Sequence, residues 1–520
     1  MCGILFTNDP CITKDDFIRA LHLMKHRGPD IVGCYASHKE CQLGHNRLKI
    51  VDLDDRSNQP FYSHDGRYVI VYNGEVYNFR ELSAKYGIEQ RTTGDTEVIL
   101  ELYTRFGPKM LDWLNGMFAF VILDTLSGDI FVARDRLGVK PLYFARKGEK
   151  LTIASEITSI LELSGSKEFD PIGLRQYQKL RTFFNGRTAY AGIEMFAPGH
   201  YMLSGRISRY WKLPDGEQDP PTDDELRELI ESAVALRCIA DVPIGSYLSG
   251  GIDSTIVAGL ASKPHTWTVG FADNNEFEWA RLASAKFNSI HSEVLMDREE
   301  FVSLAKKMIK QRKEPLSVPN EVLLYKMTQR VKEYNTVVLS GEGADELFFG
   351  YDRIFRWAAN NRWSLKDFDK LYSYGSNDDL EIVEDAVSPF MCLGQTIDIV
   401  AAFFQTAHLH GLLRRLDNAT MLSSVEARVP FVDYRLVERM AGVSFNYRMA
   451  NGAVKAPLKR IFCNLVPKEI LEREKVGFPV RVELLPLGDD VSGKTSMDKW
   501  LKFNLKELVG NLLPEELEST

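Results

Sequence analysis

Short apolar runs, broken by glycine and aspartate, dominate the chain before residue 210. Their alternation of apolar and polar positions predicts β-strands rather than helices. Only 15–26 and 96–107 repeat their apolar residues with the period of a helix. The predicted strands are 67–77, 117–124, 129–135, 141–146 and 150–155.

The pattern changes after a segment rich in Pro, Asp and Glu at about 211–225. Helical and short apolar segments then alternate, and from about residue 385 the pattern is mostly helical. Strand–helix alternation predicts a parallel sheet covered by helices. We therefore expect a β-rich domain at 1–210 and an α/β domain at 211–520. The predicted helices are 226–240, 254–261 and 278–287, and the predicted strands are 244–249, 265–271 and 335–340.

The composition is that of an ordinary globular protein of 520 residues, with 44% hydrophobic and 26% charged residues. Its net charge of −8 gives no sign of the basic surface that is typical of nucleic-acid-binding proteins. No apolar run approaches the roughly 20 residues that span a bilayer, and the start lacks the basic region of a signal peptide. The seven cysteines are scattered without a Cys-x-x-Cys pair. We therefore expect a cytoplasmic protein without disulfides, a zinc site or a membrane partner.

A glycine-rich loop at 249–254 (SGGIDS) follows one predicted strand and precedes a predicted helix. Two glycines let backbone N–H groups approach a ligand closely, and a helix N-terminus favours anions. Ser249 and Ser254 add hydroxyl donors, and Asp253 suits a Mg²⁺ ion carried by phosphates. A serine-capped turn would explain an isolated Ser-Gly-Gly, but the flanking strand and helix favour a phosphate-binding loop.

A second loop, 338–346 (VLSGEGADE), follows another predicted strand and carries Glu342, Asp345 and Glu346. The carboxyl ends of parallel strands are where such sheets bind ligands. Two loops of this kind predict one nucleotide, with metal, between them. A simple helix cap would leave the three acidic groups crowded without purpose.

A formal P-loop pattern occurs at 488–495 (GDDVSGKT). It follows a proline-containing stretch that is poor strand material. Its two aspartates would also place negative charge where phosphate has to bind. Because bare patterns match by chance, we interpret this one as a surface loop.

Cys2 directly follows Met1. Small second residues are common because aminopeptidases remove methionine next to them, and for the first six residues alone this explanation suffices. Alternatively, removal of Met1 leaves Cys2 with a thiol and an α-amine whose pKa is about 8. That amine can accept the thiol proton, which would make Cys2 an N-terminal nucleophile with its own base.

The SGGIDS loop resembles the pyrophosphate-binding loop of the ATP pyrophosphatase family, and 339–351 (LSGEGADELFFGY) resembles the second signature of asparagine synthetases. The segments 424–433, 455–459 and 473–478 are similar to later blocks of that family, in the same order. Such enzymes cleave ATP between the α- and β-phosphates, adenylate a carboxylate and let ammonia displace AMP. The resemblance implies a parallel-sheet α/β ATP pyrophosphatase domain with a helical C-terminal part, and Mg²⁺ as cofactor.

The same resemblance implies residue roles. Asp253 and Asp345 would hold Mg²⁺, Lys455 would neutralise charge on the phosphates, and Glu342 would act near the incoming ammonia as a base or an orienting group. The residues implied to bind ATP and its pyrophosphate are Leu248, Ser249, Gly250, Gly251, Asp253, Ser254, Val269, Ser340, Gly341 and Lys455.

The first half resembles the glutaminase domain of class II amidotransferases, an N-terminal-nucleophile αββα sandwich. Seven ordered blocks carry this resemblance: 1–4, 26–30, 45–52, 72–78, 93–98, 116–124 and 134–143. The resemblance implies a homodimer formed through this half. With both halves present, the first half would release ammonia and the second would consume it. The ammonia would travel between them through a dry internal passage.

For the glutaminase half, the resemblance implies that Cys2 attacks the amide carbon of glutamine. The side-chain amide of Asn73 and the backbone N–H of Gly74 would stabilise the oxyanion. Arg47 would bind the α-carboxylate of glutamine, and Asp95, assisted by Glu75, the α-ammonium. The implied glutamine-binding residues are Arg47, Ile50, Val51, Asn73, Gly74, Glu75 and Asp95.

The acceptor carboxylate is less constrained. Family members carry a DEP-x-x-D-P-like segment where this chain has 314–327 (EPLSVPNEVLLYKM). Lys313 replaces the leading acid, and the second acid–proline pair becomes Val318-Pro319-Asn320-Glu321. We expect aspartate as acceptor, with a sugar acid or a biosynthetic intermediate as the alternative. The β-lactam-forming relatives tend to lose the nucleophilic cysteine, which this chain keeps.

Two other functional classes are disfavoured. A glutaminase serving a sugar-phosphate or phosphoribosyl synthase would not need the two ATP-type loops. A catalytically inactive binding relative would be expected to lose Cys2, Asp253 or Lys455, and all three are present.

Overall fold

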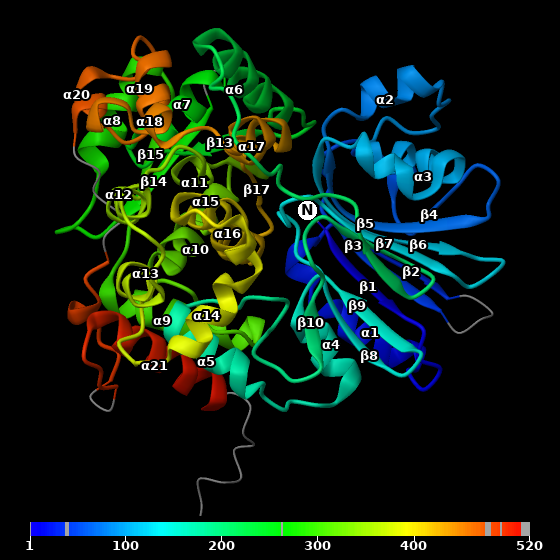
Figure 1. Ribbon diagram of the computed structural model, residues 1–520. Coiled ribbons are helices and arrows are strands. Elements are labelled where there is room, and N and C mark those ends of the chain that lie inside the picture. Colours follow the sequence, from blue (N-terminus) through cyan, green and yellow to red (C-terminus); the bar gives the residue numbers. More distant parts are fainter. Residues whose placement is uncertain (1, 37–40, 262–263, 474–479, 489–490, 511–520) are drawn as a thin grey trace, which may run out of the picture.

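The computed structural model describes residues 2–36, 41–261, 264–473, 480–488 and 491–510 (Figure 1). The N-terminal half contains two six-stranded antiparallel sheets. The first has the order β10 (Ile193–Met195), β8 (Tyr143–Lys147), β9 (Lys150–Ala154), β1 (Gly3–Thr7), β3 (Gln42–Arg47) and β2 (Ile31–Ala36). The second has the order β12 (Arg206–Arg209), β11 (His200–Leu203), β7 (Ile130–Arg134), β6 (Gly116–Asp124), β5 (Tyr68–Val76) and β4 (Phe61–Tyr62).

The two sheets face each other across one apolar layer, and helices cover their outer faces (Figure 1). Side chains such as Ile4 and Val121, one from each sheet, meet in that layer. The helices α1 (Lys14–His22) and α4 (Ile157–Ser164) pack on the first sheet, and α2 (Phe79–Tyr86) and α3 (Asp95–Phe106) pack on the second. The result is the αββα sandwich that the resemblance implied.

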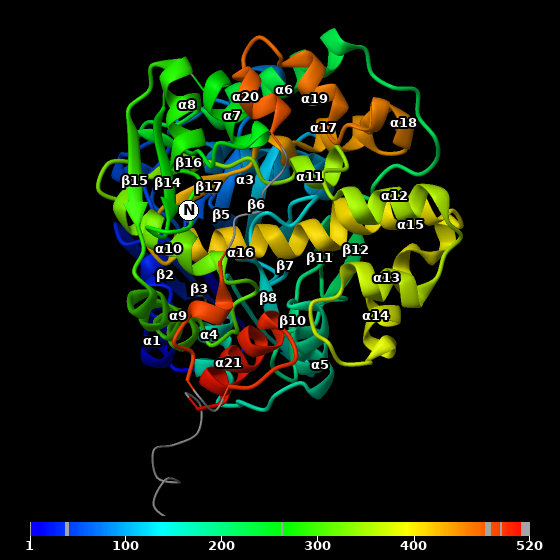
Figure 2. The ribbon, with the colours of Figure 1, turned by 90° about the vertical axis from the view of Figure 1, so that its left-hand side faces the viewer.

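The C-terminal half is built on a five-stranded parallel sheet (Figure 2). Its order is β15 (His291–Leu295), β14 (His265–Gly270), β13 (Ile244–Tyr247), β16 (Val337–Leu339) and β17 (Glu426–Arg428). The chain runs outward from β13 to β15 and then returns to β16 on the other side of β13. The sheet therefore reverses its winding between β13 and β16, which is where parallel sheets form their ligand crevice.

Helices α6 (Asp223–Arg237), α7 (Ile252–Leu260), α8 (Phe277–Phe287), α9 (Arg298–Arg312) and α10 (Asn320–Val331) accompany this sheet. A mainly helical part follows: α11 (Ala344–Leu347), α12 (Asp352–Asn360), α13 (Leu365–Tyr372), α14 (Leu380–Val387), α15 (Thr396–Phe403), the π-helix η5 (Phe404–His408), α16 (Leu409–Met421), α17 (Tyr434–Met440), α18 (Phe445–Arg448), α19 (Ala456–Ile461), α20 (Lys468–Glu472) and α21 (Ser496–Gly510).

Short 3₁₀ turns occur at η1 (Lys25–Arg27), η2 (Asp55–Ser57), η3 (Gly107–Asp112), η4 (Ser388–Leu393), η6 (Pro430–Val432), η7 (Ala450–Gly452) and η8 (Val482–Leu484). Within the described residues, no single helix is long and apolar enough to cross a membrane. The sharply bent pair Leu380–Leu393 and Thr396–Met421 meets that test by length and composition only.

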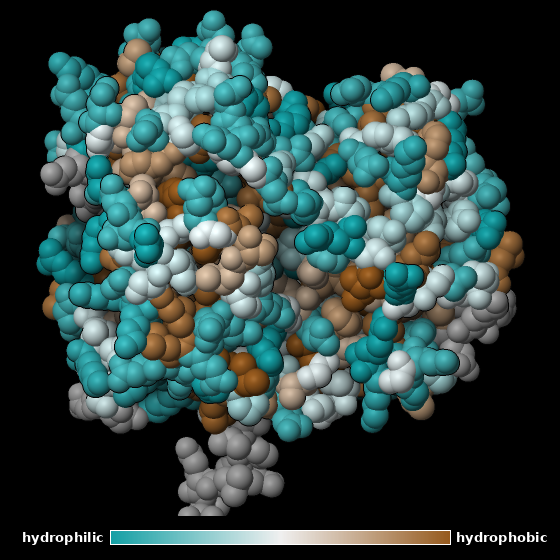
Figure 3. Space-filling model, viewed as in Figure 1, coloured by the Kyte–Doolittle hydropathy of each residue, from teal (hydrophilic) through white to brown (hydrophobic). Residues whose placement is uncertain are grey.

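The two halves share part of their apolar core. The largest apolar cluster contains Phe17 and Ile157 of the first half together with Trp267 and Trp500 of the second. The helix α5 (Pro171–Leu180) packs against α14 and α21, and the Tyr177 hydroxyl donates to the backbone oxygen of Leu316 at 2.7 Å. In the space-filling view the surface is indented between the halves (Figure 3).

The predicted strands and helices are confirmed, but the apolar pattern missed several elements. In the first half it missed the short helices α2, α4 and α5. In the second it missed β15 and β17, and β17 is a buried three-residue strand that reads Glu-Ala-Arg. Its two charged side chains pair with each other, with Arg428 Nε 2.6 Å from Glu426 Oε1, so the strand is buried without being apolar.

The formal P-loop pattern at 488–495 is not a phosphate loop in the described residues. No strand precedes Gly488 in 480–488, and Asp489 and Asp490 lie outside the described residues. Thr495 instead caps α21, accepting from the Asp498 backbone N–H at 3.1 Å. The interpretation as a loop is therefore confirmed for the described part.

Candidate functional site

A small pocket surrounds Cys2 at the start of β1. Its volume is about 30 Å³, and it lies where β3, β5 and the N-terminus of α3 converge. Burial raises the pKa of the Cys2 thiol, against the opposing effects of the Leu48 backbone amide and the Arg47 charge. The predicted residues that line the pocket are Cys2, Arg47, Ile50, Val51, Gly74, Glu75 and Asp95, and the residues not predicted are Leu48, Ser57, Gln59, Tyr72, Gly94 and Thr96.

Asn73 contacts Cys2 through one end of its amide and keeps the other end free. Its Oδ1 atom accepts from the Cys2 backbone nitrogen at 3.0 Å. Its Nδ2 atom is buried and has no hydrogen-bond acceptor among the described residues. Buried donors are nearly always paired, so this N–H lacks its usual acceptor, although Asn73 is not among the residues that line the pocket. The neighbouring Gly74 allows no side chain, because a Cβ atom there would lie 2.1 Å from the Met117 carbonyl oxygen.

Arg47 is a buried cation held by neutral hydrogen-bond acceptors. Its side chain is 4% exposed. Nη1 donates to the Asp54 backbone oxygen at 2.8 Å and to Asn58 Oδ1 at 2.6 Å, and Nη2 donates to the Asp52 backbone oxygen. In the part of the chain that the structure describes, no carboxylate forms an ion pair with it, and burial lowers its pKa. Its neutral acceptors fix the guanidinium and leave its charge available for a carboxylate.

Asp95 and Glu75 are the two acidic residues that line the pocket. Asp95 Oδ2 accepts from the Tyr72 hydroxyl at 2.7 Å and from the Val76 backbone N–H at 2.8 Å. Burial raises the pKa of Asp95 to about 6. Burial, and then the charge of Asp95, raise the pKa of Glu75 well above its ordinary value. A pair of buried acids in which the charge of one disfavours ionisation of the other suits a cation such as an ammonium group.

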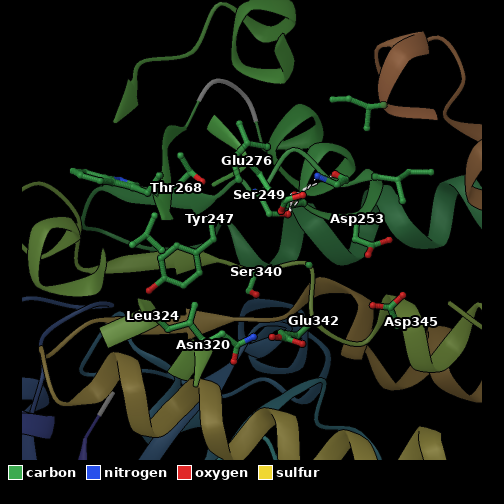
Figure 4. A pocket seen from close by; sticks show the side chains of 18 of the residues that line it. Tyr247, Ser249, Asp253, Thr268, Glu276, Asn320, Leu324, Ser340, Glu342 and Asp345 are labelled. Carbon is green, nitrogen blue, oxygen red and sulfur yellow. Dashed lines mark hydrogen bonds between the residues drawn. The ribbon is translucent and has the colours of Figure 1, made fainter. Parts of the chain in front are cut away.

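A larger cavity lies at the carboxyl ends of β13 and β16, at the point where the sheet reverses its winding (Figure 4). Its volume is about 290 Å³, close to the lower end for small-molecule sites. The predicted residues that line it are Leu248, Ser249, Gly251, Asp253, Ser254, Val269, Ser340, Gly341, Glu342, Asp345 and Lys455. Gly250 does not line the cavity. It has φ +72°, and a Cβ atom there would lie 2.4 Å from Trp279 Cβ.

The two glycine-rich loops contact each other. Ser249 Oγ lies 3.1 Å from Ser254 Oγ and accepts from the Gly251 backbone N–H at 3.3 Å. A Cβ atom on Gly341 would lie 2.9 Å from the Ser254 backbone nitrogen, so the second loop packs directly on the first. Gly251 is also the N-cap of α7, whose positive end faces this region. The arrangement can bind phosphate groups through backbone N–H groups and hydroxyls.

Lys455 connects the two loops. Its Nζ atom lies 2.5 Å from Asp253 Oδ2 and 2.5 Å from Asp345 Oδ1, and its side chain is 3% exposed. The attraction of the two carboxylates outweighs burial and raises the pKa of Lys455 above its ordinary value. Asp253 and Asp345 point into the same space from α7 and α11 (Figure 4).

The two carboxylates fit a Mg²⁺ ion that brings phosphate ligands with it. Oxygen ligands and few protein contacts are typical of Mg²⁺. Within the described residues, no group of three or more His, Cys, Asp and Glu side chains could hold a metal alone. Phosphate oxygens would therefore have to complete the coordination.

Glu342 and Glu346 point to different surroundings. Glu342 lines the cavity, and its Oε1 lies 2.5 Å from Arg415 Nη2. Glu346 is not part of the lining. Its Oε1 accepts from the Tyr351 hydroxyl at 2.6 Å, with His408 Nε2 at 3.7 Å.

The sequence did not single out several residues of this cavity: Tyr247, Ile252, Trp267, Thr268, Glu276, Asn320, Leu324, Met327, Arg415, Val454, Lys459, Ile470 and Arg473. Tyr247 and Trp267 lie on β13 and β14, so their positions on predicted strands were a usable signal. Asn320, Leu324 and Met327 belong to the divergent stretch 314–327. Arg415 lies on α16, and no local sequence pattern marks it as a site residue. Of the block 473–478, only Arg473 lies inside the described residues.

Comparisons with known proteins agree with this two-site organisation. Residues 225–515 match the asparagine synthase family model, and residues 1–211 match the glutamine amidotransferase domain model. The glutamine-hydrolyzing asparagine synthetase 1 of Bacillus subtilis (strain 168) is 28% identical over 594 residues, which cover 99% of this chain and 90% of that protein.

Two further relatives cover most of the chain. A putative glutamine-hydrolyzing asparagine synthetase of Mycobacterium bovis is 30% identical, over 89% of this chain and 84% of that protein. The glutamine-hydrolyzing asparagine synthetase B of Escherichia coli (strain K12) is 29% identical, over 92% of this chain and 82% of that protein. The chain therefore belongs to the asparagine synthase family and carries the family's N-terminal glutamine amidotransferase domain.

Proposed function

We propose that this protein is a glutamine-dependent, ATP-using amidotransferase that converts aspartate to asparagine and releases glutamate, AMP and diphosphate. The observation that carries this proposal is the combination of two sites in one chain. One is a buried cysteine beside a free amide donor, and the other is a cavity formed by two phosphate-type loops around Lys455. The first site suits release of ammonia, and the second suits activation of a carboxylate that ammonia can attack.

In the glutaminase half, Cys2 is the proposed nucleophile. After removal of Met1, its α-amine accepts the thiol proton, and the sulfur attacks the amide carbon of glutamine. Negative charge then develops on the amide oxygen, where Asn73 Nδ2 and the Gly74 N–H donate hydrogen bonds. The amine returns its proton to the departing nitrogen, ammonia leaves, and water hydrolyses the thioester to glutamate.

Glutamine is held in place by charges at both ends of the pocket. The guanidinium of Arg47, which neutral acceptors hold in place, pairs with the α-carboxylate. Asp95, with Glu75 nearby, pairs with the α-ammonium. Ile50 and Val51 form the wall along the aliphatic stem of the substrate.

In the synthetase half, the side-chain carboxylate of aspartate attacks the α-phosphorus of ATP, and diphosphate leaves. Leu248, Val269, Ser340 and Gly341, which line the cavity, are the proposed AMP-binding residues. The proposed diphosphate site is Ser249, Gly250, Gly251, Asp253 and Ser254; Gly250 contributes by the turn it permits. Lys455 neutralises the charge that builds up on the leaving diphosphate.

Mg²⁺, held by Asp253 and Asp345, would lower the negative charge of the phosphates when it is bound. The resulting β-aspartyl-AMP reacts with ammonia, and AMP departs. Glu342 orients the incoming ammonia or accepts its proton, and Arg415 fixes the Glu342 carboxylate. Because ammonia loses its nucleophilicity on protonation, the two sites have to communicate through the interior of the protein.

A second acceptor class is favoured by one specific observation. Asn320 and Leu324, which come from the divergent stretch 314–327, line the cavity itself. The same chemistry could therefore amidate another carboxylate, such as a sugar acid or a biosynthetic intermediate. Product analysis with a panel of carboxylates separates the two cases.

We further propose a boundary between the two domains at residues 210 and 211, a homodimer and a cytoplasmic location. The boundary is supported by the family-model matches, which end at 211 and resume at 225. The dimer rests on the family resemblance, and the location rests on the scattered cysteines.

Two variants test the proposed division of labour. Cys2→Ala removes the nucleophile, so we expect loss of glutamine-dependent asparagine formation and retention of ammonia-dependent formation. Lys455→Met is expected to stop AMP and diphosphate release with either nitrogen source while glutamine hydrolysis continues. If Cys2→Ala keeps full glutamine-dependent activity, or if Lys455→Met keeps AMP release, the corresponding half of the proposal is wrong.

A further inference from the structure

The loop that follows Arg47 forms one wall of the glutamine pocket and is held from the synthetase half. Asp241 accepts, through Oδ2, from the Asp52 backbone N–H at 2.8 Å. In return, the Asp241 backbone N–H donates to the Ile50 backbone oxygen at 2.9 Å. Ile50 lines the pocket. The two hydrogen bonds therefore join the pocket wall to the turn that leads into β13.

Asp52 belongs to this loop but does not itself line the pocket. Its φ is +51°, a left-handed conformation that non-glycine residues seldom adopt and that surrounding contacts have to maintain. Its backbone oxygen accepts from Arg47 Nη2. Its Oδ2 atom accepts from the Thr93 backbone N–H at 2.7 Å and from Ser57 Oγ at 2.7 Å. Asp52 thus contacts both the arginine and the loop before Asp95, the two ends of the proposed glutamine site.

The turn that carries Asp241 is itself anchored. Arg428 Nη1 donates to the Arg237 backbone oxygen at 2.9 Å and to the Ile239 backbone oxygen at 2.6 Å. The same guanidinium lies 3.7 Å from Glu75 Oε1, through Nη2. Apolar contacts add to this anchor, because Leu48 and Ile50 form one cluster with Val337 and Met421 of the synthetase half.

We propose that Asp241, a residue of the synthetase half, is a positioning residue for glutamine binding. By accepting from the Asp52 N–H, its carboxylate holds Asp52 in the left-handed conformation from which the Asp52 carbonyl orients Arg47. The glutamine pocket is thereby completed by the other half of the chain. This inference rests on the proposed glutaminase function and assigns it a residue outside the amidotransferase domain match of 1–211.

The test measures glutamate release by the full-length protein with Asp241→Ala. We expect the KM for glutamine to rise about fivefold, the effect of losing one hydrogen bond of typical net strength, and kcat to stay within about twofold. Asp241→Asn keeps an acceptor oxygen and is expected to restore most of the affinity. Ammonia-dependent AMP release, measured on the same preparations, should be unchanged.

A matched control and a double variant separate positioning from general loosening. Asp379→Ala breaks another contact between the halves, with Arg175 at 2.8 Å, and neither residue lines the pocket. This variant should leave the KM unchanged. In an Arg47→Ala background, Asp241→Ala should change kcat/KM by less than about twofold, because its effect passes through Arg47.

Three results overturn the inference: an unchanged KM in Asp241→Ala, an equal rise in Asp379→Ala, or a full additive loss in the Arg47→Ala background. An absence of glutamate release in the unaltered protein would instead contradict the proposed function, so the two failures are distinguishable.

Discussion

The Nζ atom of Lys455 lies 2.5 Å from Asp345 Oδ1, and the same atom lies 2.5 Å from Asp253 Oδ2. One buried cation therefore bridges the two loops that follow β13 and β16. Because the two carboxylates outnumber the one ammonium group, the cluster keeps a net negative charge that can attract a cation accompanying phosphate. The arrangement makes ATP chemistry sensitive to either carboxylate, and neither carboxylate lines the Cys2 pocket.

Asp345→Asn tests this arrangement. Removing one charge weakens both the Lys455 contact and the proposed Mg²⁺ site, so we expect AMP release to fall by about 100-fold or more. Chelation of Mg²⁺ should abolish AMP release in the unaltered protein. Glutamate release should persist in both experiments. AMP formation that survives both the substitution and the chelator would exclude this site.

Asn73→Ala removes the free amide donor beside Cys2. Donors of this kind act mainly in the transition state, so we expect kcat for glutamine hydrolysis to fall about 100- to 1,000-fold with little change in KM. The exposed Asn360, changed to Ala, serves as a control for loss of an asparagine side chain. A rise in KM without a loss of kcat would show that Asn73 only binds the substrate.

The pKa of Asp95, raised to about 6 by burial, predicts a pH dependence for glutamine binding. Below that pH the carboxyl group is neutral and cannot pair with the α-ammonium of glutamine. We therefore expect kcat/KM for glutamine hydrolysis to fall as the pH decreases through about 6. Asp95→Asn should give a low value that does not change across this range. A profile that stays flat in the unaltered protein would show that ionised Asp95 is not required.

Glu346 predicts a pH dependence of stability rather than of activity. Burial, and then the charge of Asp345, raise its pKa to about 8, from an ordinary value of about 4.3. A raised pKa means that the folded state binds the proton more tightly, so this contribution is complete below pH 4 and is lost as the pH rises through about 8. The neighbouring groups are Asp345, Glu342, Tyr351 and His408.

We therefore expect the melting temperature of the unaltered protein to fall between pH 6 and pH 9 relative to Glu346→Gln. Glutamine keeps an oxygen that can accept from the Tyr351 hydroxyl and does not ionise. Parallel melting curves at every pH would contradict the assignment.

The strand–loop–helix order around residues 249–254 could be predicted from sequence because it is local. A short apolar strand, two glycines and a following helix are adjacent in the chain. The same holds for the second loop after β16. Their closeness to each other also followed, since neighbouring parallel strands end at one edge of the sheet.

Contacts between distant segments could not be predicted in this way. Arg415 reaches Glu342 from α16, and Asp241 reaches Asp52 across the two halves. Neither residue stands in a distinctive local pattern. The buried strand β17 was missed for a related reason, since Arg428 and Glu426 neutralise each other only after folding. The glutamine-site residues came from family resemblance, because a lone Arg47 or Asp95 reads as surface charge.

The most direct test of the central claim follows the amide nitrogen of glutamine. Purified protein with Met1 removed is incubated with Mg-ATP, amide-¹⁵N-glutamine and L-aspartate, and the products are analysed by mass spectrometry. The account predicts ¹⁵N-asparagine in equal amount to AMP and diphosphate. Labelled ammonia without labelled asparagine, in the presence of all substrates, would contradict the claim that aspartate is the acceptor.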